Sequence, residues 1–266
     1  MQKKLSLVVA TVALLGLSAC SLLPEKVDET KNWSVSKLYS EAREEMEGQH
    51  YERAIELFGK LETNYPFGTY AQQAQMEIAY AYYKTGDQAQ ALAAVERFIK
   101  LHPNHANVDY MYYLRGLVNF NDQIGILNFI YEQDPTERDP KATREAFTAF
   151  KLLVDKFPNS KYTPDALDRM KYLINAMAQY EVHVARYYYR REAYLAAANR
   201  AQGAISDYRD SPAIEEALFI MTRAYDKLGM IELRDDAKRV FDKNYPNSRF
   251  LTAEGSKAER HWWKIW

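Results

Sequence analysis

The side chains that could carry chemistry are few and lie far apart along the 266-residue chain. His102 and His105 have a spacing of three that could suit a metal ion, but they lie in a loop beside a proline, and no Cys or carboxylate completes a ligand set. The acidic pairs Glu44-Glu45 and Glu215-Glu216 fall on helix faces that we expect to be exposed, whereas a general acid–base pair needs burial. No glycine-rich phosphate loop and no nucleophile elbow is present in the sequence. We therefore expect no catalytic residue, no metal site and no cofactor.

Cys20, the only cysteine of the chain, ends an N-terminal segment that is typical of secretion. Lys3 and Lys4 precede a weakly polar to apolar run, 5–17, which is too short to span a bilayer of about 30 Å as a helix. The residues Leu17-Ser18-Ala19-Cys20 resemble the bacterial lipobox, in which the cysteine thiol receives a diacylglyceryl group before cleavage. We predict a signal peptide at 1–19, lipid attachment at Cys20 and a tether at 20–33; the alternative is an ordinary signal peptide with an incidental cysteine.

The composition favours an ordered helical chain. It contains only 10 Gly and 9 Pro but 21 Tyr, together with abundant residues that favour helices. A single cysteine excludes a disulfide framework. The net charge of −1 gives no indication of a nucleic-acid partner.

Small residues recur at a fixed distance from helix stops, which predicts a repeat protein. An alanine precedes a proline by twelve residues three times, in the pairs Ala54 and Pro66, Ala91 and Pro103, and Ala146 and Pro158. Two further copies keep the interval with one member replaced, Ala197 and Arg209, and Arg234 and Pro246. Small residues that let helices approach lie twelve positions earlier, and large residues lie seven positions later: Ala42, Ala79 and Ala185, and Leu61, Phe98, Leu153 and Phe241.

The run from Tyr80 to Asp87, followed by Ala91 and Leu101-His102-Pro103, resembles a tetratricopeptide repeat. This resemblance implies an all-α, right-handed superhelical solenoid of about five antiparallel helix pairs, because such pairs are stable only when stacked. The pairs are expected at approximately 34–67, 69–104, 107–158, 162–209 and 212–247, with an insertion at 121–139. We divide the chain into N-terminal repeats, 34–158, C-terminal repeats, 159–247, and a tail, 248–266, that contains Trp262, Trp263 and Trp266.

Local signals predict where several of these helices begin and end. Asp139-Pro140 and Ser211-Pro212 each combine a capping residue with a proline and predict helix starts. Gly86 and Gly229 predict helix ends followed by sharp turns.

Over nearly the whole mature chain, the sequence also resembles the BamD or ComL-like family of outer-membrane assembly lipoproteins. The stretches that carry this resemblance are the lipobox, Tyr65–Tyr70 with Gln72-Gln73, Ala91–Pro103 leading to Asp109-Tyr110, Arg138–Pro140 with Phe157–Ser160, Val184–Tyr188, and Asn199-Arg200. The tryptophan tail departs from the pattern, because it is not shared by all members of the family.

The resemblance implies a non-catalytic scaffold, lipid-anchored on the periplasmic face of the outer membrane, that helps β-barrel proteins to fold and insert. Ser21 fits this location, since the family resemblance implies that an Asp there would favour the inner membrane. The implied partners are unfolded barrel substrates, the barrel-assembly subunit and accessory lipoproteins. Arg200 occupies the position of an arginine implicated in docking that subunit, and we place Arg186 with it.

The first repeats are expected to hold a peptide-binding groove, lined mostly by the first helix of each pair. Repeat register and the family resemblance assign it these residues: Tyr39, Arg43, Tyr65, Pro66, Phe67, Gly68, Gln73, Tyr80, Tyr83, Tyr110 and Tyr113. Tyrosine rings with a polar tip can hold a peptide without requiring one sequence.

Several alternatives remain open from the sequence. Tyrosines at helical spacing also fit packing between repeats, and Arg200 also fits a solvated helix charge. The tryptophan tail fits either a membrane interface or packing against the fifth pair. A second function is a periplasmic repeat lipoprotein that coordinates cell-envelope, peptidoglycan or division proteins. An enzyme is disfavoured because the repeats leave only 248–266 for a catalytic domain.

Overall fold

The computed structural model describes residues 29–123 and 140–251. Within these ranges the chain forms ten α-helices and one 3-10 helix, Arg249–Leu251, and no strand. The α-helices are α2 (Val35–Glu47), α3 (Tyr51–Asn64), α4 (Thr69–Thr85), α5 (Gln88–Leu101), α6 (Val108–Gln123), α7 (Pro140–Lys156), α8 (Thr163–Arg190), α9 (Tyr194–Asp207), α10 (Ile214–Lys227) and α11 (Ile231–Asn244).

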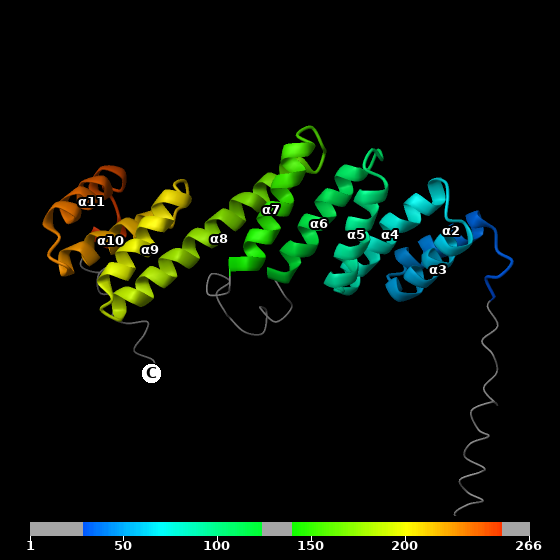
Figure 1. Ribbon diagram of the computed structural model, residues 1–266, viewed down its shortest axis with the longest axis horizontal. Coiled ribbons are helices and arrows are strands. Elements are labelled where there is room, and N and C mark those ends of the chain that lie inside the picture. The colour runs from blue at the N-terminus through cyan, green and yellow to red at the C-terminus, as the bar shows by residue number, and fades with distance from the viewer. Residues whose placement is uncertain (1–28, 124–139, 252–266) are drawn as a thin grey trace, which may run out of the picture.

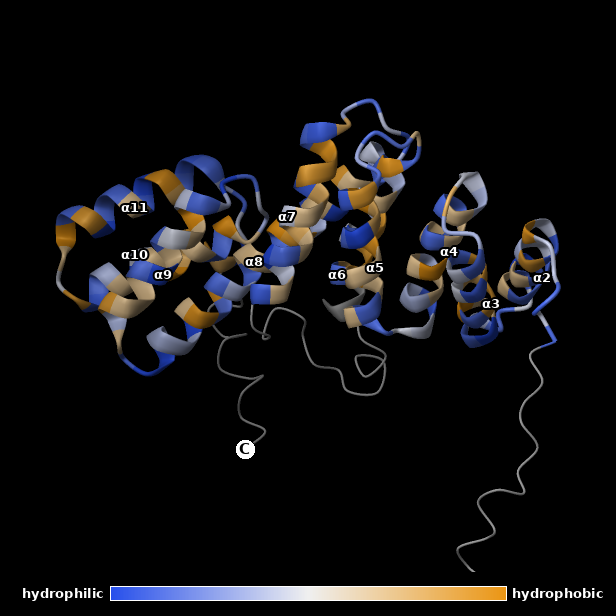
Figure 2. Cartoon of the chain, turned by 45° about the vertical axis from the view of Figure 1, so that its right-hand side comes forward, coloured by the Kyte–Doolittle hydropathy of each residue, from blue (hydrophilic) through white to orange (hydrophobic). Residues whose placement is uncertain are grey.

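The helices form five consecutive pairs arranged in one elongated row (Figure 1). Each helix packs against the next along the chain, and first helices of neighbouring pairs also touch, α2 with α4, α4 with α6, and α8 with α10. Hydrophobic and hydrophilic bands alternate around the helices (Figure 2), as expected when each pair buries its apolar face against its neighbours. The prediction of an all-α solenoid of five helix pairs is confirmed.

The spacing of small and large residues in the sequence corresponds to the buried contacts of the helix pairs. The alanines of the repeat frame are fully buried, at 0% exposure: Ala42, Ala54, Ala79, Ala91, Ala146, Ala185 and Ala197. Of the four large residues, Leu61, Phe98 and Leu153 are also at 0% exposure, and Phe241 is 3% exposed. The fifth copy has Arg234 in place of alanine, and this side chain is partly exposed and pairs with Asp226.

The long helix α8 joins the two halves of the row. Its 28 residues correspond to a length of about 42 Å. Near its start, Ala166 and Leu173 pack in one cluster with α7, and near its end, Val182 and Ala185 pack in another cluster with α9 and α10. The N-terminal and C-terminal repeats are therefore connected by one continuous helix.

Most of the predicted helix limits agree with the structure, with two differences. Gly86 ends α4 in the left-handed conformation at φ +78°, Gly229 follows α10 at φ +69°, and α7 begins at Pro140. The helix predicted to start at Ser211-Pro212 begins slightly later, because residues 211–213 form a turn in which the Ile214 N–H donates to the Ser211 carbonyl, and α10 begins at Ile214. The predicted start of the insertion at 121 is also too early, since the regular hydrogen bonding of α6 continues to Gln123.

Residues 124–139 of the predicted insertion lie outside the described residues. So do the predicted signal peptide, Cys20, most of the tether, and residues 252–266 of the tail with Trp262, Trp263 and Trp266.

Helices α6 and α7 approach so closely that only glycine fits at position 116. A Cβ atom on Gly116 would overlap the ring of Phe150, which is fully buried in α7. We expect Gly116→Ala to lower the free energy of unfolding by about 1–3 kcal/mol through overpacking. The measurement is urea denaturation followed by circular dichroism. Gly203→Ala in α9 is the matched control, because nothing lies within 4 Å of its Cβ position, and it should leave stability unchanged or raise it.

Candidate functional site

Aromatic rings on or beside the first helices of four pairs form several separate contact groups. Tyr39 on α2 lies 5.2 Å from Tyr70 on α4, and Tyr80 lies 6.1 Å from Tyr83 (ring centroids). On α6 and α8, Phe120 contacts Tyr172 at 5.8 Å. We name this set the aromatic row and define it by these residues: Tyr39, Tyr70, Tyr80, Tyr83, Tyr110, Tyr113, Phe120, Tyr162 and Tyr172.

The carboxylate of Glu77 connects the first and middle parts of the aromatic row. Burial, and after it the negative charge of Glu77, raise the pKa of both Tyr39 and Tyr110 above that of a free tyrosine. Tyr110 also contacts Tyr162 at the start of α8, with ring centroids 5.6 Å apart. These phenols are therefore neutral at physiological pH and can donate as well as accept hydrogen bonds.

The middle of the row is held by a polar cluster between α6 and α8. The rings of Tyr113 and Tyr162 stack at 4.8 Å with an interplanar angle of 14°, and the Tyr113 hydroxyl donates to Asp165 Oδ2 at 2.7 Å. Burial raises the pKa of Tyr113 to about 12. Burial alone would raise the pKa of Asp165, but hydrogen bonds from Arg169 and Tyr113 lower it. The carboxylate is thus charged and fixes the orientation of the tyrosine.

The loop before α4 exposes the predicted residues Tyr65, Pro66, Phe67 and Gly68. Phe67 is 91% exposed, and Tyr65 is 37% exposed, with its hydroxyl donating to the Trp33 carbonyl at 3.1 Å. Gly68 has φ +96°, a conformation that favours glycine, and directly precedes α4. An exposed phenylalanine in a loop fixed to the first pair is a suitable contact for an apolar side chain of a partner.

Arg43 and Arg186 occupy the same position of the repeat frame, eleven residues before Ala54 and Ala197. Arg43 pairs with Glu77 on α4 at 2.5 Å, and Arg186 pairs with Glu216 on α10 at 2.5 Å. Each ion pair links the first helices of neighbouring pairs. A ligand that contacts either arginine must share it with this partner.

Arg200 on α9 is 46% exposed and pairs with Glu181 on α8 at 3.0 Å, while Glu181 is 13% exposed. Arg200 is therefore held by α8, whereas Arg186 is held by Glu216 of α10. Gln73, the remaining predicted residue, is exposed on the first turns of α4.

Six residues of the row and of the polar cluster beside it were not predicted from the sequence. These are Tyr70, Phe120, Tyr162, Asp165, Arg169 and Tyr172. Their positions on or beside the first helices of their pairs could have identified them in the sequence, but the insertion in the third pair obscures the repeat register between α6 and α8.

The described residues show a different role for the two histidines considered as metal ligands. The rings of His102 and His105 pack on Phe98 at 5.0 and 5.3 Å, and His102 Nε2 lies 3.0 Å from Gln75 Oε1. Among the described residues, no group of three His, Cys, Asp or Glu side chains could hold a metal ion. A helix long and apolar enough to cross a membrane is likewise absent from the ranges 29–123 and 140–251.

Comparisons with known proteins agree with the sequence resemblance. The family model described as YfiO, outer membrane lipoprotein, matches residues 31–240. The chain is 47% identical over 263 residues to the outer membrane protein assembly factor BamD of Neisseria meningitidis serogroup A, covering 97% of this chain and 98% of the relative. The protein of the same name from Vibrio cholerae is 37% identical, with 88% and 95% of the two chains covered. The chain therefore belongs to the YfiO family of outer membrane lipoproteins, together with the proteins named BamD.

Proposed function

We propose that the chain is a non-catalytic scaffold of outer-membrane protein assembly that holds unfolded β-barrel segments along the aromatic row. The names of its relatives support a role in outer-membrane protein assembly, and the aromatic row supports the binding of unfolded segments. In this proposal Cys20 carries the lipid that holds the chain on the periplasmic face of the outer membrane. The partners are the barrel-assembly subunit, accessory lipoproteins and the unfolded substrates.

The spread of aromatic rings over the first helices of four pairs is the observation that carries this proposal. Contact groups join α2 with α4 and α6 with the start of α8, and the partly exposed rings among them can each meet a side chain of an extended segment. Tyrosine rings provide large contact areas at low entropic cost, and their hydroxyls can bond the unpaired backbone of an unfolded strand. Tyr172, at 47% exposure, is the most exposed residue of the row, and Phe67, at 91%, lies in the loop before α4.

Site-specific photo-crosslinking in cells tests the substrate role. We expect a benzoylphenylalanine at Phe67 or Tyr172 to crosslink newly exported β-barrel proteins, because Tyr172 is an exposed residue of the row and Phe67 is exposed in the loop before α4. Leu195 on α9, which is 54% exposed and outside the row, is the matched control position. Equal crosslinking at Leu195 would show that contact is non-specific. Absence of crosslinked substrate at both Phe67 and Tyr172 would reject the proposal.

Docking to the barrel-assembly subunit is expected to depend on Arg200. Removing this guanidinium in Arg200→Ala should weaken capture of the subunit at least about tenfold, because a charge-assisted hydrogen bond is worth about 1.5–3 kcal/mol. Arg200→Glu is a poorer test, since it would place a second carboxylate against the poorly exposed Glu181. Capture from mild-detergent extracts measures the effect, and unchanged circular dichroism shows that the fold is kept.

Glu181→Gln is the control for this prediction. It weakens the ion pair of Arg200 but leaves the guanidinium in place, so docking should persist or improve. If Glu181→Gln and Arg200→Ala weaken capture equally, Arg200 acts only by holding α9 against α8. If no barrel-assembly protein is captured with the unaltered chain, the second function, coordination of cell-envelope or division proteins, replaces the first.

A further inference from the structure

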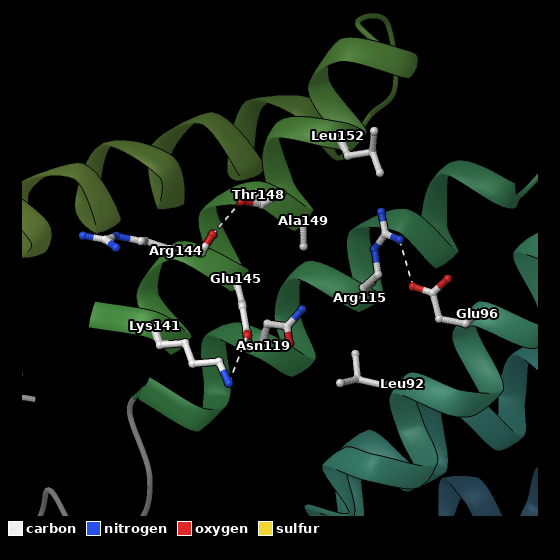
Figure 3. A pocket seen from close by; sticks show the side chains of 10 residues that line it. All are labelled: Leu92, Glu96, Arg115, Asn119, Lys141, Arg144, Glu145, Thr148, Ala149 and Leu152. Carbon is white, nitrogen blue, oxygen red and sulfur yellow. Dashed lines mark hydrogen bonds and ion pairs between the residues drawn. The ribbon is translucent and has the colours of Figure 1, made fainter. Parts of the chain in front are cut away.

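A pocket of about 560 Å³ that the aromatic row does not use lies between α5, α6 and α7. Leu92 and Glu96 of α5 form one wall, Ala149 and Leu152 of α7 form the other, and Arg115 of α6 lies between them (Figure 3). The lining combines the apolar side chains of Leu92, Ala149 and Leu152 with polar and charged ones, and Arg115 borders the pocket with part of its guanidinium buried. Arg144, although it borders the pocket, points away from it in Figure 3.

Arg115 is held in an unusual state for a buried cation. Its side chain is only 15% exposed, and its guanidinium lies 4.9 Å from the centre of the Tyr112 ring. Nη1 donates to Glu96 at 2.8 Å, but Nε and Nη2 are shielded from solvent and have no hydrogen-bond acceptor among the described residues. Buried donors without acceptors are rare in folded proteins and are costly when the group is charged.

The two unpaired donors lie on the same edge of the guanidinium. This edge presents parallel N–H groups at the spacing of the two oxygens of a carboxylate, which is the usual geometry of bidentate arginine binding. Glu96 accepts only from Nη1, which does not belong to this edge. The Glu96 side chain is 56% exposed at the rim of the pocket. An exposed, flexible glutamate can move away with little loss of packing.

We propose that this pocket binds an acidic side chain, flanked by aliphatic residues, on a partner polypeptide. The partner carboxylate displaces Glu96 and takes the free edge of Arg115, which turns towards the pocket as Glu96 leaves. The flanking aliphatic side chains of the partner contact Leu92 and Leu152 on the two walls. This site lies outside the aromatic row, so substitutions at Phe67 or Tyr172 leave it unchanged.

Arginine Nε–H NMR of the full-length chain tests the proposal directly. The probe is an end-blocked peptide, Ala-Leu-Glu-Leu-Ala, and the matched probe carries Gln in place of Glu. We expect the Nε–H signal of Arg115 to shift on titration with the Glu peptide only. Arg115→Lys, which keeps the charge but loses the two-donor edge, should bind the peptide about tenfold more weakly.

Glu96→Ala gives the decisive result because its expected effect has the opposite sign. If Glu96 competes with the ligand, its removal should strengthen peptide binding about three- to tenfold, whereas a purely structural ion pair predicts no gain. Glu145→Ala, on the other wall and paired with Lys141, removes the same charge without freeing Arg115 and should have a smaller effect. Equal gains in both variants would overturn the proposal.

Other occupants of the pocket would give distinct results, each of which overturns the proposal. A shift of the Arg115 signal with protein concentration alone would indicate a second copy of the chain. A shift on replacing residues 124–139 by a Gly-Ser linker, without peptide, would indicate that the chain fills its own pocket. An equal shift with inorganic phosphate would indicate a general anion site.

Discussion

Cys20→Ser is expected to move the chain from the outer-membrane fraction to the soluble periplasmic fraction. Serine cannot receive the diacylglyceryl group, and each buried acyl CH₂ contributes about 0.8 kcal/mol to membrane binding. Loss of two or more acyl chains therefore removes a lasting anchor rather than weakening it. Cell fractionation with mass spectrometry of the mature N-terminus measures both the location and the modification.

Ser21→Asp is the matched control for this prediction. It keeps Cys20 and its acylation, so the chain should remain on a membrane but shift towards the inner membrane. A Cys20→Ser chain that still sediments with the outer membrane would contradict lipid anchoring through this residue, and would shift attention to the tryptophan tail.

Phe98→Ala is expected to lower the free energy of unfolding by about 3–5 kcal/mol. Phe98 is fully buried in the cluster between α4, α5 and α6, and the rings of His102 and His105 also rest on it. Its removal leaves a cavity in the second helix pair and loosens the loop that follows α5. Because each pair is stabilised mainly by its neighbours, the loss should be visible in the whole unfolding transition.

Urea denaturation followed by circular dichroism measures this change, with Leu101→Ala as the control. Leu101 ends the same helix but is 56% exposed, so its truncation should change stability by less than about 0.5 kcal/mol. A loss at Phe98 no larger than that at Leu101 would show that the second pair contributes little to the stability of the row.

Much of the fold could be predicted because its determinants are local or periodic. Close helix packing requires small residues at Ala54 and Ala91, and a left-handed turn requires glycine at Gly86, so these positions can be recognised without knowing the fold. The two limits that differ have separate causes. At Ser211-Pro212 a turn uses the same residue types as a helix start, and at 121–123 the helix has no stop signal before Gln123.

The candidate site was predicted only in part. Register along the first helices predicts Tyr39, Tyr80 and Tyr113 as groove residues, and in the structure their rings contact other aromatic rings of the row. Register does not show which side chain from the next pair meets them, so Tyr162 and Asp165 were missed. It also does not show that Arg43 and Arg186 already have intramolecular partners.

The sequence by itself determined the number of helix pairs, the buried alanines and the family, because these depend on residue type and on spacing along one chain. Only the tertiary structure decided how Tyr113 meets Tyr162, and how Arg115 comes to lie in a pocket with two unpaired donors. The physical reason is that these contacts depend on the rotation between neighbouring helix pairs. That rotation is set by the packing of many side chains, and no spacing in the sequence specifies it.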